Sequence, residues 1–260
     1  MSSYGRSYGF RTNWKGFVTP AVKTIVLICT GVFLVQTLVK LFLPSDDTIF
    51  LNYYLGLVPR AVTHGLRFWQ PLTYIFLHAD IWHLLINMLF LWMFGVDLER
   101  AWGTRRFWNY FLVTGIGAGL VNILVKTALD PHGIGTSLGP PTIGASGAIY
   151  AVLVAAAIMF PDREVWLIPF PVHIPMKIYV LAAVAIEFFL TLGAGGDNVS
   201  HVTHLGGIAI GYIYLRRGSF MYRARNGYLD WKRKRARRKF EVYARDHRDE
   251  PPSRPDNWLN

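Results

Sequence analysis

The chain has 260 residues, of which 52% are hydrophobic and 17% are charged, and its formal net charge is +11. This apolar content exceeds what a soluble domain ordinarily buries, so the composition indicates a membrane protein. The single cysteine, Cys29, excludes both an internal disulfide and a zinc site made of cysteines. The basic residues are concentrated after Arg216, outside the apolar body, so we expect contact with membrane lipid and no binding of nucleic acid.

Six runs of apolar residues approach the length of about 20 residues that a helix needs to cross a bilayer. In chain order they are residues 24–43, 82–96, 107–129, 143–160, 174–192 and 199–215. Pro140 and Pro141 precede the fourth run, as is typical of the start of a helix. The first run has no small-residue cleavage site behind it, so we expect a retained anchor. The pattern predicts six transmembrane helices.

The segments outside these runs divide the rest of the chain. Residues 44–80 interleave aromatic and aliphatic side chains with Arg and Thr, which predicts short amphipathic pieces at the membrane interface. Residues 218–260 carry a dense basic cluster and a proline-rich end, which predicts a cytoplasmic helix followed by disorder. We therefore expect an N-terminal segment (1–19), a membrane domain (20–217) and a basic tail (218–260).

The distribution of basic residues predicts the orientation of the bundle. They gather before the first run, after the second, between the fourth and fifth, and after the sixth. By the positive-inside rule these segments face the cytoplasm, which places both termini there. Residues 44–80, 130–142 and 193–198 then face outside.

Two polar residues lie near the outer ends of different predicted helices. Ser146 belongs to the sequence GASG (144–147), and His204 begins the sequence HLGG (204–207). A polar group inside a transmembrane helix is costly, so each is a candidate for function. A serine hydroxyl becomes a good nucleophile when a base such as imidazole accepts its proton at about 3 Å. The pair predicts a catalytic Ser146 and His204 dyad.

Glycines make this dyad geometrically possible. Gly144 and Gly147 accompany the serine, and Gly207 and Gly211 follow the histidine four residues apart. Small residues let the backbones of two transmembrane helices approach closely. Ser146 also lies near a helix N-terminus, where backbone N–H groups favour a developing negative charge.

His83 and Asn87 in the second run are four residues apart and therefore share one helix face near the outer side. Both side chains can donate hydrogen bonds. Acyl transfer passes through an oxyanion, which such donors stabilise beside the Ser146 N–H. A simpler interpretation is that they hold the second helix to its neighbours.

Together these motifs resemble the rhomboid family of intramembrane serine proteases over about residues 20–217. The matching residues are HLLIN (83–87), GASG (144–147), Tyr150, HLGGIAIG (204–211), and Glu99-Arg100 followed by Trp102-Gly103. GxSG alone is a weak signal because soluble hydrolases share it, but the ordered set on separate apolar helices is specific. Thr203, where alanine is common in the family, and an additional His201 are the departures.

The resemblance implies an all-α membrane protein, a six-transmembrane-helix rhomboid-like bundle with both termini cytoplasmic. It implies a Ser146 and His204 dyad without an acidic third member and an oxyanion site that includes His83 and Asn87. Tyr150, packed against the histidine ring, and Gly144 would serve substrate binding or packing of the dyad. Residues 193–198 and the start of the fifth helix would gate a water-filled cavity. Single-span membrane proteins would be the substrates and a bacterial cytoplasmic membrane the location.

Other interpretations stay open at the level of sequence. An inactive relative that binds membrane clients would share the fold, although both Ser146 and His204 are present. A transporter would show repeated halves with broken helices or a charged pathway, and neither is evident. Glu187, an acid within the fifth run, could orient a histidine, line the substrate path or simply find a polar partner.

A metal site is a further alternative. His201 and His204, with His78 and His83, could gather zinc. Against this, the chain has no HExxH sequence and no carboxylate at ligand spacing beside them, and we expect His78 and His201 at the water interface. We therefore expect no metal and no cofactor.

Overall fold

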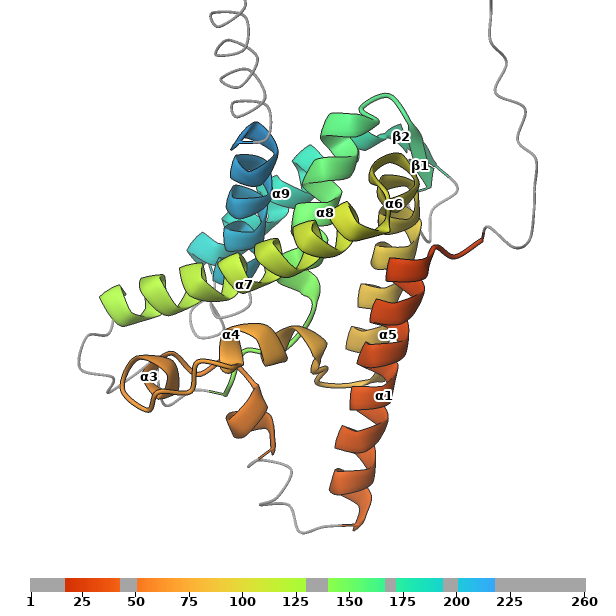
Figure 1. The fold of residues 1–260 in the computed structure, drawn as a ribbon. Helices are drawn as coiled ribbons and strands as arrows, with labels where there is room; N and C mark the ends of the chain where they lie inside the picture. Colours follow the sequence, from red (N-terminus) through yellow and green to blue (C-terminus); the bar gives the residue numbers. More distant parts are fainter. Residues whose placement is uncertain (1–16, 43–50, 130–139, 167–171, 194–200, 218–260) are drawn as a thin grey trace, which may run out of the picture. The chain divides into compact units, whose positions relative to one another are not determined.

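All six apolar runs contain helices in the structure, a computed structural model that describes residues 17–42, 51–129, 140–166, 172–193 and 201–217 (Figure 1). The helices of the first four runs are α1 (Pro20–Phe42), α5 (Ile81–Phe90) continued by a π-helical turn η3 (Leu91–Gly95) and α6 (Val96–Trp102), α7 (Thr104–Leu129), and α8 (Ser146–Met159). Two more follow, α9 (Met176–Gly193) and residues 201–217. The second run, short by sequence, gains length because the helix continues without a break to Trp102.

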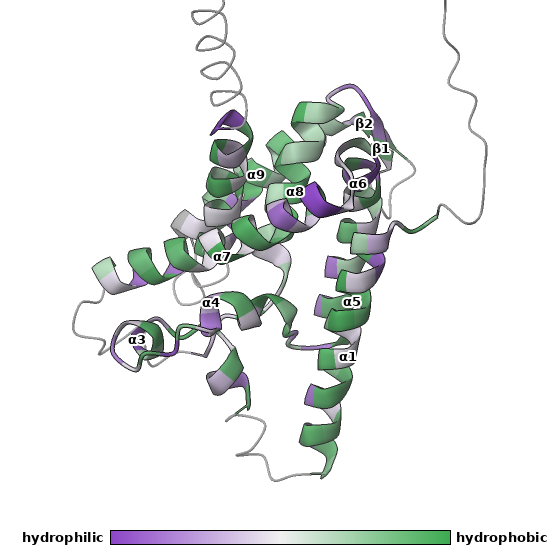
Figure 2. Ribbon diagram, in the orientation of Figure 1, coloured by the Kyte–Doolittle hydropathy of each residue, from purple (hydrophilic) through white to green (hydrophobic). Residues whose placement is uncertain are grey.

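Three helices of the described part are long and apolar enough to cross a membrane, namely Pro20–Phe42, Ile81–Trp102 and Thr104–Leu129. Large apolar side chains are exposed on outer helices, as with Leu41 on α1 and Phe189 on α9. Figure 2 shows that α1 is predominantly hydrophobic along its length. Such surfaces are stable in lipid, where apolar exposure costs nothing.

α8 forms the core of the membrane domain. Its residues Ala151, Val152, Ala155 and Ala156 have no exposed surface, and α7 packs along it. A helix that is hydrophobic all round is buried among other helices. The helix that carries the predicted nucleophile is therefore held on several sides.

α8 begins at Ser146, later than the predicted residue 143. Pro140 and Pro141 consequently lie in the segment that leads to the helix and not at its first turn. The physical reason is Gly144, whose φ of +128° is incompatible with a right-handed helix.

The described part of the predicted interfacial segment, residues 51–80, folds into short helical pieces. Residues 51–55 are helical, followed by α3 (Pro59–Thr63), α4 (Gln70–Thr73) and a 3₁₀ turn η2 (Tyr74–Phe76). The buried Gln70 side chain joins them, because its Oε1 accepts from Val58 N at 3.0 Å and its Nε2 donates to Tyr53 O at 2.8 Å. Such an amide satisfies backbone groups that no regular ladder pairs.

A small antiparallel hairpin between α8 and α9 was not predicted. β1 (Glu164–Trp166) pairs with β2 (His173–Pro175), with Val165 opposite Ile174. Strands of three residues carry too little alternation to be recognised in a sequence.

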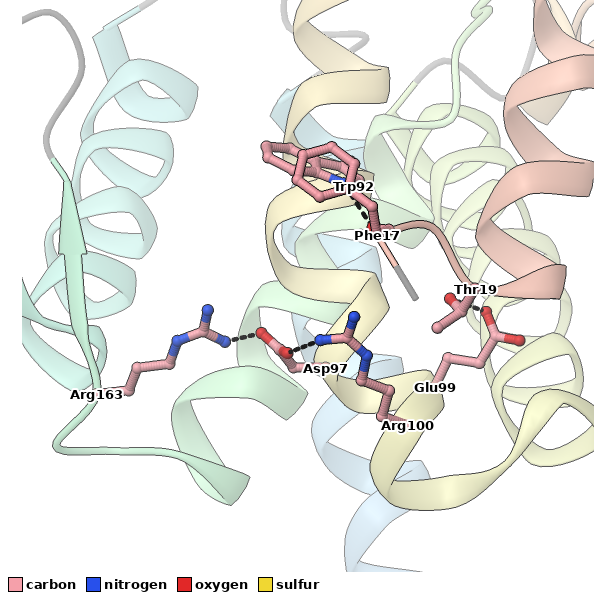
Figure 3. A network of polar contacts seen from close by, with 7 residues as sticks. All are labelled: Phe17, Thr19, Trp92, Asp97, Glu99, Arg100 and Arg163. Carbon is pink, nitrogen blue, oxygen red and sulfur yellow. Dashed lines mark hydrogen bonds and ion pairs between the residues drawn. The ribbon is translucent and has the colours of Figure 1, made fainter. Parts of the chain in front are cut away.

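The beginning of α1 is held by a buried carboxylate from α6 (Figure 3). Glu99, which is 3% exposed, accepts from the N–H groups of Ala21 at 2.8 Å and Val22 at 3.0 Å. It also accepts from the hydroxyls of Thr19 and Thr104. A carboxylate at a helix N-terminus satisfies unpaired N–H groups and interacts favourably with the helix dipole.

A second polar group lies nearby in Figure 3. Asp97 forms ion pairs with Arg100 and with Arg163, which precedes β1. Trp92 donates its Nε1–H to Phe17 O at 3.2 Å. These contacts connect the hairpin to α6 and the start of α1 to η3.

Candidate active site

The segment that leads to Ser146 is anchored by the residues 51–80. Leu57 and Thr142 exchange two backbone hydrogen bonds of 2.9 and 3.0 Å, and Gly144 N donates to Tyr74 O at 2.9 Å. Because both anchors precede the helix directly, they fix the position of Ser146 at the first turn of α8. Backbone N–H groups of a first turn have no intrahelical acceptor and remain free to bind an anion.

Ser146 and His204 meet, although they lie on different helices. His204 Nε2 is 2.7 Å from Ser146 Oγ, a hydrogen-bond distance. The structure thus brings together the two residues of the predicted dyad in the geometry that a general base requires.

Glycines allow this approach. A Cβ on Gly207 would lie 1.9 Å from Gly147 O, and a Cβ on Gly211 would lie 2.8 Å from the Cβ of Ala151. The helix of residues 201–217 therefore packs directly on the backbone of α8. Gly144 has a different role from the predicted one, since it precedes the helix.

Gly144 faces His83. A Cβ at Gly144 would lie 2.8 Å from His83 Nε2 and 3.7 Å from Ser146 Oγ. The absence of a side chain thus leaves space between the imidazole of α5 and the serine hydroxyl. A single oxygen atom of a substrate could occupy this space.

His83 and Asn87 lie on one face of α5, as predicted. Asp80 caps this helix by accepting from His83 N at 2.9 Å, and Ala79 N donates to His83 Nδ1 at 3.4 Å. An accepting Nδ1 places the proton of the neutral ring on Nε2, the nitrogen that faces Gly144. Asn87 is buried, and its Nδ2 donates to His83 O at 2.9 Å, which leaves a second N–H.

The ring of Tyr150 stacks on the ring of His204. Their centroids are 4.5 Å apart and their planes are inclined by 26°. Tyr150 follows Ser146 by one helical turn, so α8 supplies both the hydroxyl and the surface on which the imidazole rests.

These residues open onto one cavity of about 340 Å³. Its lining comes from α5, α8, α9, the segment before α8 and the last helix, and consists of His83, Ile86, Asn87, Phe90, Ile143, Ser146, Ile149, Tyr150, Leu153, Tyr179, Ala183 and His204. Tyr179 represents the start of the predicted fifth helix. The rest of the predicted gate, residues 194–198, lies outside the described residues.

Glu187 is the residue whose importance sequence reasoning left open. It lies on α9 and is 6% exposed, and its carboxylate oxygens contact Tyr150 OH at 2.5 Å, His201 Nδ1 at 2.7 Å and His204 Nδ1 at 3.1 Å. The last contact has the distance of an ion pair without the angle of a hydrogen bond. The sequence indicated only that an acid lies inside an apolar run. It could not identify the partners of this acid, because they lie on other helices.

The expectation that no carboxylate lies beside the histidines was therefore wrong. Glu187, His201 and His204 have ligand-type atoms within 4.8 Å of one another, a spacing that could hold a metal. In the structure the Glu187 carboxylate contacts both imidazoles directly. His78 was also expected at the water interface, yet it is 1% exposed, and its backbone N–H donates to Gln36 of α1 while its ring contacts that of His83 on α5.

Thr203, a departure noted in the sequence, packs into the helix interface. Its Oγ1 accepts from Asn122 Nδ2 at 2.9 Å, and a Cβ on Gly147 would lie 3.1 Å from its Cγ2. The hydroxyl thus links the helix of residues 201–217 to α7 without displacing His204.

Comparison with known proteins identifies the family. Residues 65–218 match the model of the Rhomboid domain. The chain is 31% identical over 144 residues to Rhomboid protein 1, mitochondrial, of Saccharomyces cerevisiae, which covers 54% of this chain and 38% of that protein. It is 29% identical over 241 residues to RHOMBOID-like protein 12, mitochondrial, of Arabidopsis thaliana, covering 84% and 67%.

A third relative is the Presenilin-associated rhomboid-like protein, mitochondrial, of Rattus norvegicus, at 29% identity over 143 residues. The match covers 55% of this chain and 36% of that protein. The chain thus spans little more than a third of the length of two of these three relatives.

Proposed function

Because the chain belongs to the rhomboid family of integral membrane proteins, we propose that it is an intramembrane serine endopeptidase that cleaves transmembrane segments. The observation that supports this most directly is the 2.7 Å contact between Ser146 Oγ and His204 Nε2. The hydroxyl and its base line the same cavity as His83 and Asn87. Nucleophile, base and oxyanion donors are the groups that acyl transfer needs.

The mechanism begins when an unwound stretch of substrate places its scissile carbonyl beside Ser146. His204 Nε2 takes the hydroxyl proton as Ser146 Oγ attacks the carbonyl carbon. The resulting oxyanion occupies the space beside Gly144, where the Ser146 N–H and the side chains of His83 and Asn87 donate to it. His204 then protonates the leaving amine. In the second half, His204 takes a proton from a water molecule that attacks the acyl carbon and returns it to Ser146 Oγ as the acyl bond breaks.

The cavity supports a peptide substrate. Ile86 and Phe90 of α5 face the same space as Tyr179 and Ala183 of α9, so apolar side chains of two helices border it. An apolar lining with a few polar groups suits an extended segment of a membrane protein. We propose single-span proteins with helix-breaking residues and a small residue before the cleaved bond as substrates.

The test is co-expression with a panel of tagged single-span proteins. We expect cleavage of at least one by the wild type and none by Ser146→Ala or His204→Ala. A fluorophosphonate should label the wild type in detergent and leave Ser146→Ala unlabelled. Equal labelling of the two would eliminate the protease hypothesis.

The alternative is an inactive rhomboid-like protein that binds membrane clients. Such a protein would have the same fold. This hypothesis predicts that single-span proteins are bound stably and stay intact. It also predicts that the fluorophosphonate fails to react, because a binding protein has no need of an activated Ser146.

We further propose six spans with both termini in the cytoplasm. Arg100, Arg163 and Lys177 support this, since they lie at helix ends that the positive-inside rule assigns to the cytoplasm. Cysteines placed singly at residues 12 and 250 of a Cys29→Ala chain should resist an impermeant maleimide in intact cells, whereas one at residue 65 should react. Labelling of residue 12 or 250 would refute this topology.

The location in a bacterial cytoplasmic membrane stays a prediction from the six-helix form. The relatives compared above are mitochondrial proteins by name. Both locations are compatible with an integral membrane protein of this family.

A further inference from the structure

The Glu187 carboxylate lies directly behind the proposed base and has no role in the mechanism so far. Its side chain is 8% exposed, and Oε1 lies 3.1 Å from His204 Nδ1. Nε2 of the same ring contacts Ser146 Oγ on the opposite edge. The imidazole therefore lies between the hydroxyl of α8 and a carboxylate of α9.

Two further groups hold this carboxylate in place. Tyr150 OH donates to Oε1 at 2.5 Å, and His201 Nδ1 contacts Oε2 at 2.7 Å. A buried carboxylate is stable only when donors satisfy its oxygens. Because one partner lies on α8 and the other on the last helix, the position of Glu187 is fixed from both elements that form the dyad.

The position of the Glu187 carboxylate matches the tautomer that His204 needs in order to act as a base. To accept the Ser146 proton, Nε2 must present a lone pair, so the neutral ring carries its proton on Nδ1. Nδ1 is the atom that faces Glu187. An anionic acceptor at that atom favours the tautomer that can act as base and stabilises the imidazolium formed afterwards.

We propose that Glu187 is a positioning residue that orients His204, which makes the site a Ser146, His204 and Glu187 triad. The inference rests on the proposed protease function and departs from the resemblance, which implies a dyad without an acid. During attack the Ser146 proton moves to His204 Nε2 as Oγ bonds to the carbonyl carbon. The Nδ1 proton stays on His204, and Glu187 stays ionised throughout.

Glu187 acts through the histidine and not on the substrate. The described lining of the cavity includes His204 and Tyr150 but not Glu187. Removing the carboxylate should therefore lower kcat with little change in KM. The titratable groups that face this site are Ser146 and Tyr150 from α8, His83 from α5, Tyr179 from α9 and His201 from the last helix.

The first experiment measures peptidase kinetics of Glu187→Gln in detergent against pH. We expect kcat to fall by about 10²- to 10⁴-fold. The pH profile of kcat/KM should also change, because a neutral amide interacts more weakly than a carboxylate with the His204 imidazolium. Glu187→Asp should restore part of the rate. Glu164→Gln, an exposed acid on β1, is the matched control and should behave as wild type.

The second experiment reads the tautomer without enzymatic activity. In ¹⁵N-histidine-labelled protein, with His204 assigned by loss of its signal in His204→Asn, the wild type should show protonated Nδ1 and Glu187→Gln a mixture of tautomers. If the wild type shows a protonated His204 Nδ1 yet cleaves no substrate, the protease function is refuted, whereas the orientation of His204 by Glu187 is retained. An unchanged pH profile and an unchanged tautomer in Glu187→Gln would overturn the positioning.

Metal analysis of the purified wild type completes the test. Less than a tenth of an equivalent of zinc is expected, because the proposal places a proton, and not a metal ion, on the His204 Nδ1 that faces Glu187. A stoichiometric ion lost in Glu187→Gln and in His201→Gln would overturn the proposal, because the same three side chains would then be ligands.

Discussion

Two features of Gly144 exclude a side chain. Its backbone φ is +128°, and a Cβ there would lie 2.8 Å from His83 Nε2. Gly144→Ala should therefore strain the backbone and push the imidazole away from the oxyanion space. We expect kcat to fall by about 10²-fold, the usual effect of losing one oxyanion donor. Peptidase kinetics in detergent measure this change.

The control for Gly144→Ala is Gly31→Ala. Gly31 lies on the exposed side of α1, and a Cβ there would meet no atom within 4 Å. This variant should keep full activity and an equal or higher melting temperature, because alanine favours a helix. A wild-type rate in Gly144→Ala would show that His83 is not held at this glycine.

His78 makes stability depend on pH. Burial, followed by the nearby His83, lowers the pKa of His78 to about 4, against about 6.5 in an unfolded chain. Between these values the unfolded state binds more protons, so stability is complete above pH 6.5 and is lost as the pH falls towards 4. From pH 7 to pH 5 the loss is about 2 kcal/mol.

The test compares apparent melting temperatures in detergent at pH 7 and pH 5. His78→Leu should reduce the decrease seen in the wild type, because no proton can then bind at this position. The ring nitrogens of His78 are buried with no hydrogen-bond partner among the described residues, so leucine removes a polar group that is not satisfied. An equal decrease in both proteins would contradict the assignment to His78.

At the scale of elements, α1 depends on a residue that lies far away in sequence. Glu99 of α6 satisfies the N–H groups of Ala21 and Val22 at the start of α1. Glu99→Gln removes the charge and one acceptor from a buried site, which should cost about 2 kcal/mol of stability. A lower melting temperature with unchanged labelling of Ser146 by fluorophosphonate at low temperature is the expected result.

Asp97→Asn provides the matched change of acid to amide two residues earlier in α6. Its partners Arg100 and Arg163 are each nearly half exposed, and ion pairs of that kind contribute little. We expect a change within about 0.5 kcal/mol. Equal destabilisation by the two variants would show that α1 does not depend on the Glu99 carboxylate.

At the scale of the whole molecule, the active site exists because segments about 60 residues apart pack backbone to backbone. Any side chain at Gly207 would overlap Gly147 O, at 1.9 Å. Gly207→Ala should therefore separate the last helix from α8 and lengthen the contact between Ser146 and His204. We expect loss of activity together with about 1–3 kcal/mol of destabilisation, the usual cost of overpacking.

Thermal denaturation and peptidase assays of Gly207→Ala, beside Gly31→Ala, measure both effects. An active and fully stable Gly207→Ala would mean that the two helices can separate without loss of the dyad.

The sequence by itself determined the apolar helices, the family and the residues at the centre of the site. Apolar runs, prolines before a helix, the spacing of His83 and Asn87, and the short motifs around Ser146 and His204 are local patterns that follow from lipid as solvent and from helix periodicity. Six helices and the contact between Ser146 and His204 could be predicted in this way. The roles of these residues in catalysis stay predictions.

Only the tertiary structure decided which distant polar groups meet. Glu187 and His204, Glu99 and the start of α1, and the bridge between Leu57 and Thr142 join residues that no sequence period relates. The burial of His78 arises in the same way, beside Gln36 of α1 and His83 of α5. In a low-dielectric interior each buried polar group must find a partner, and packing of the whole chain selects that partner.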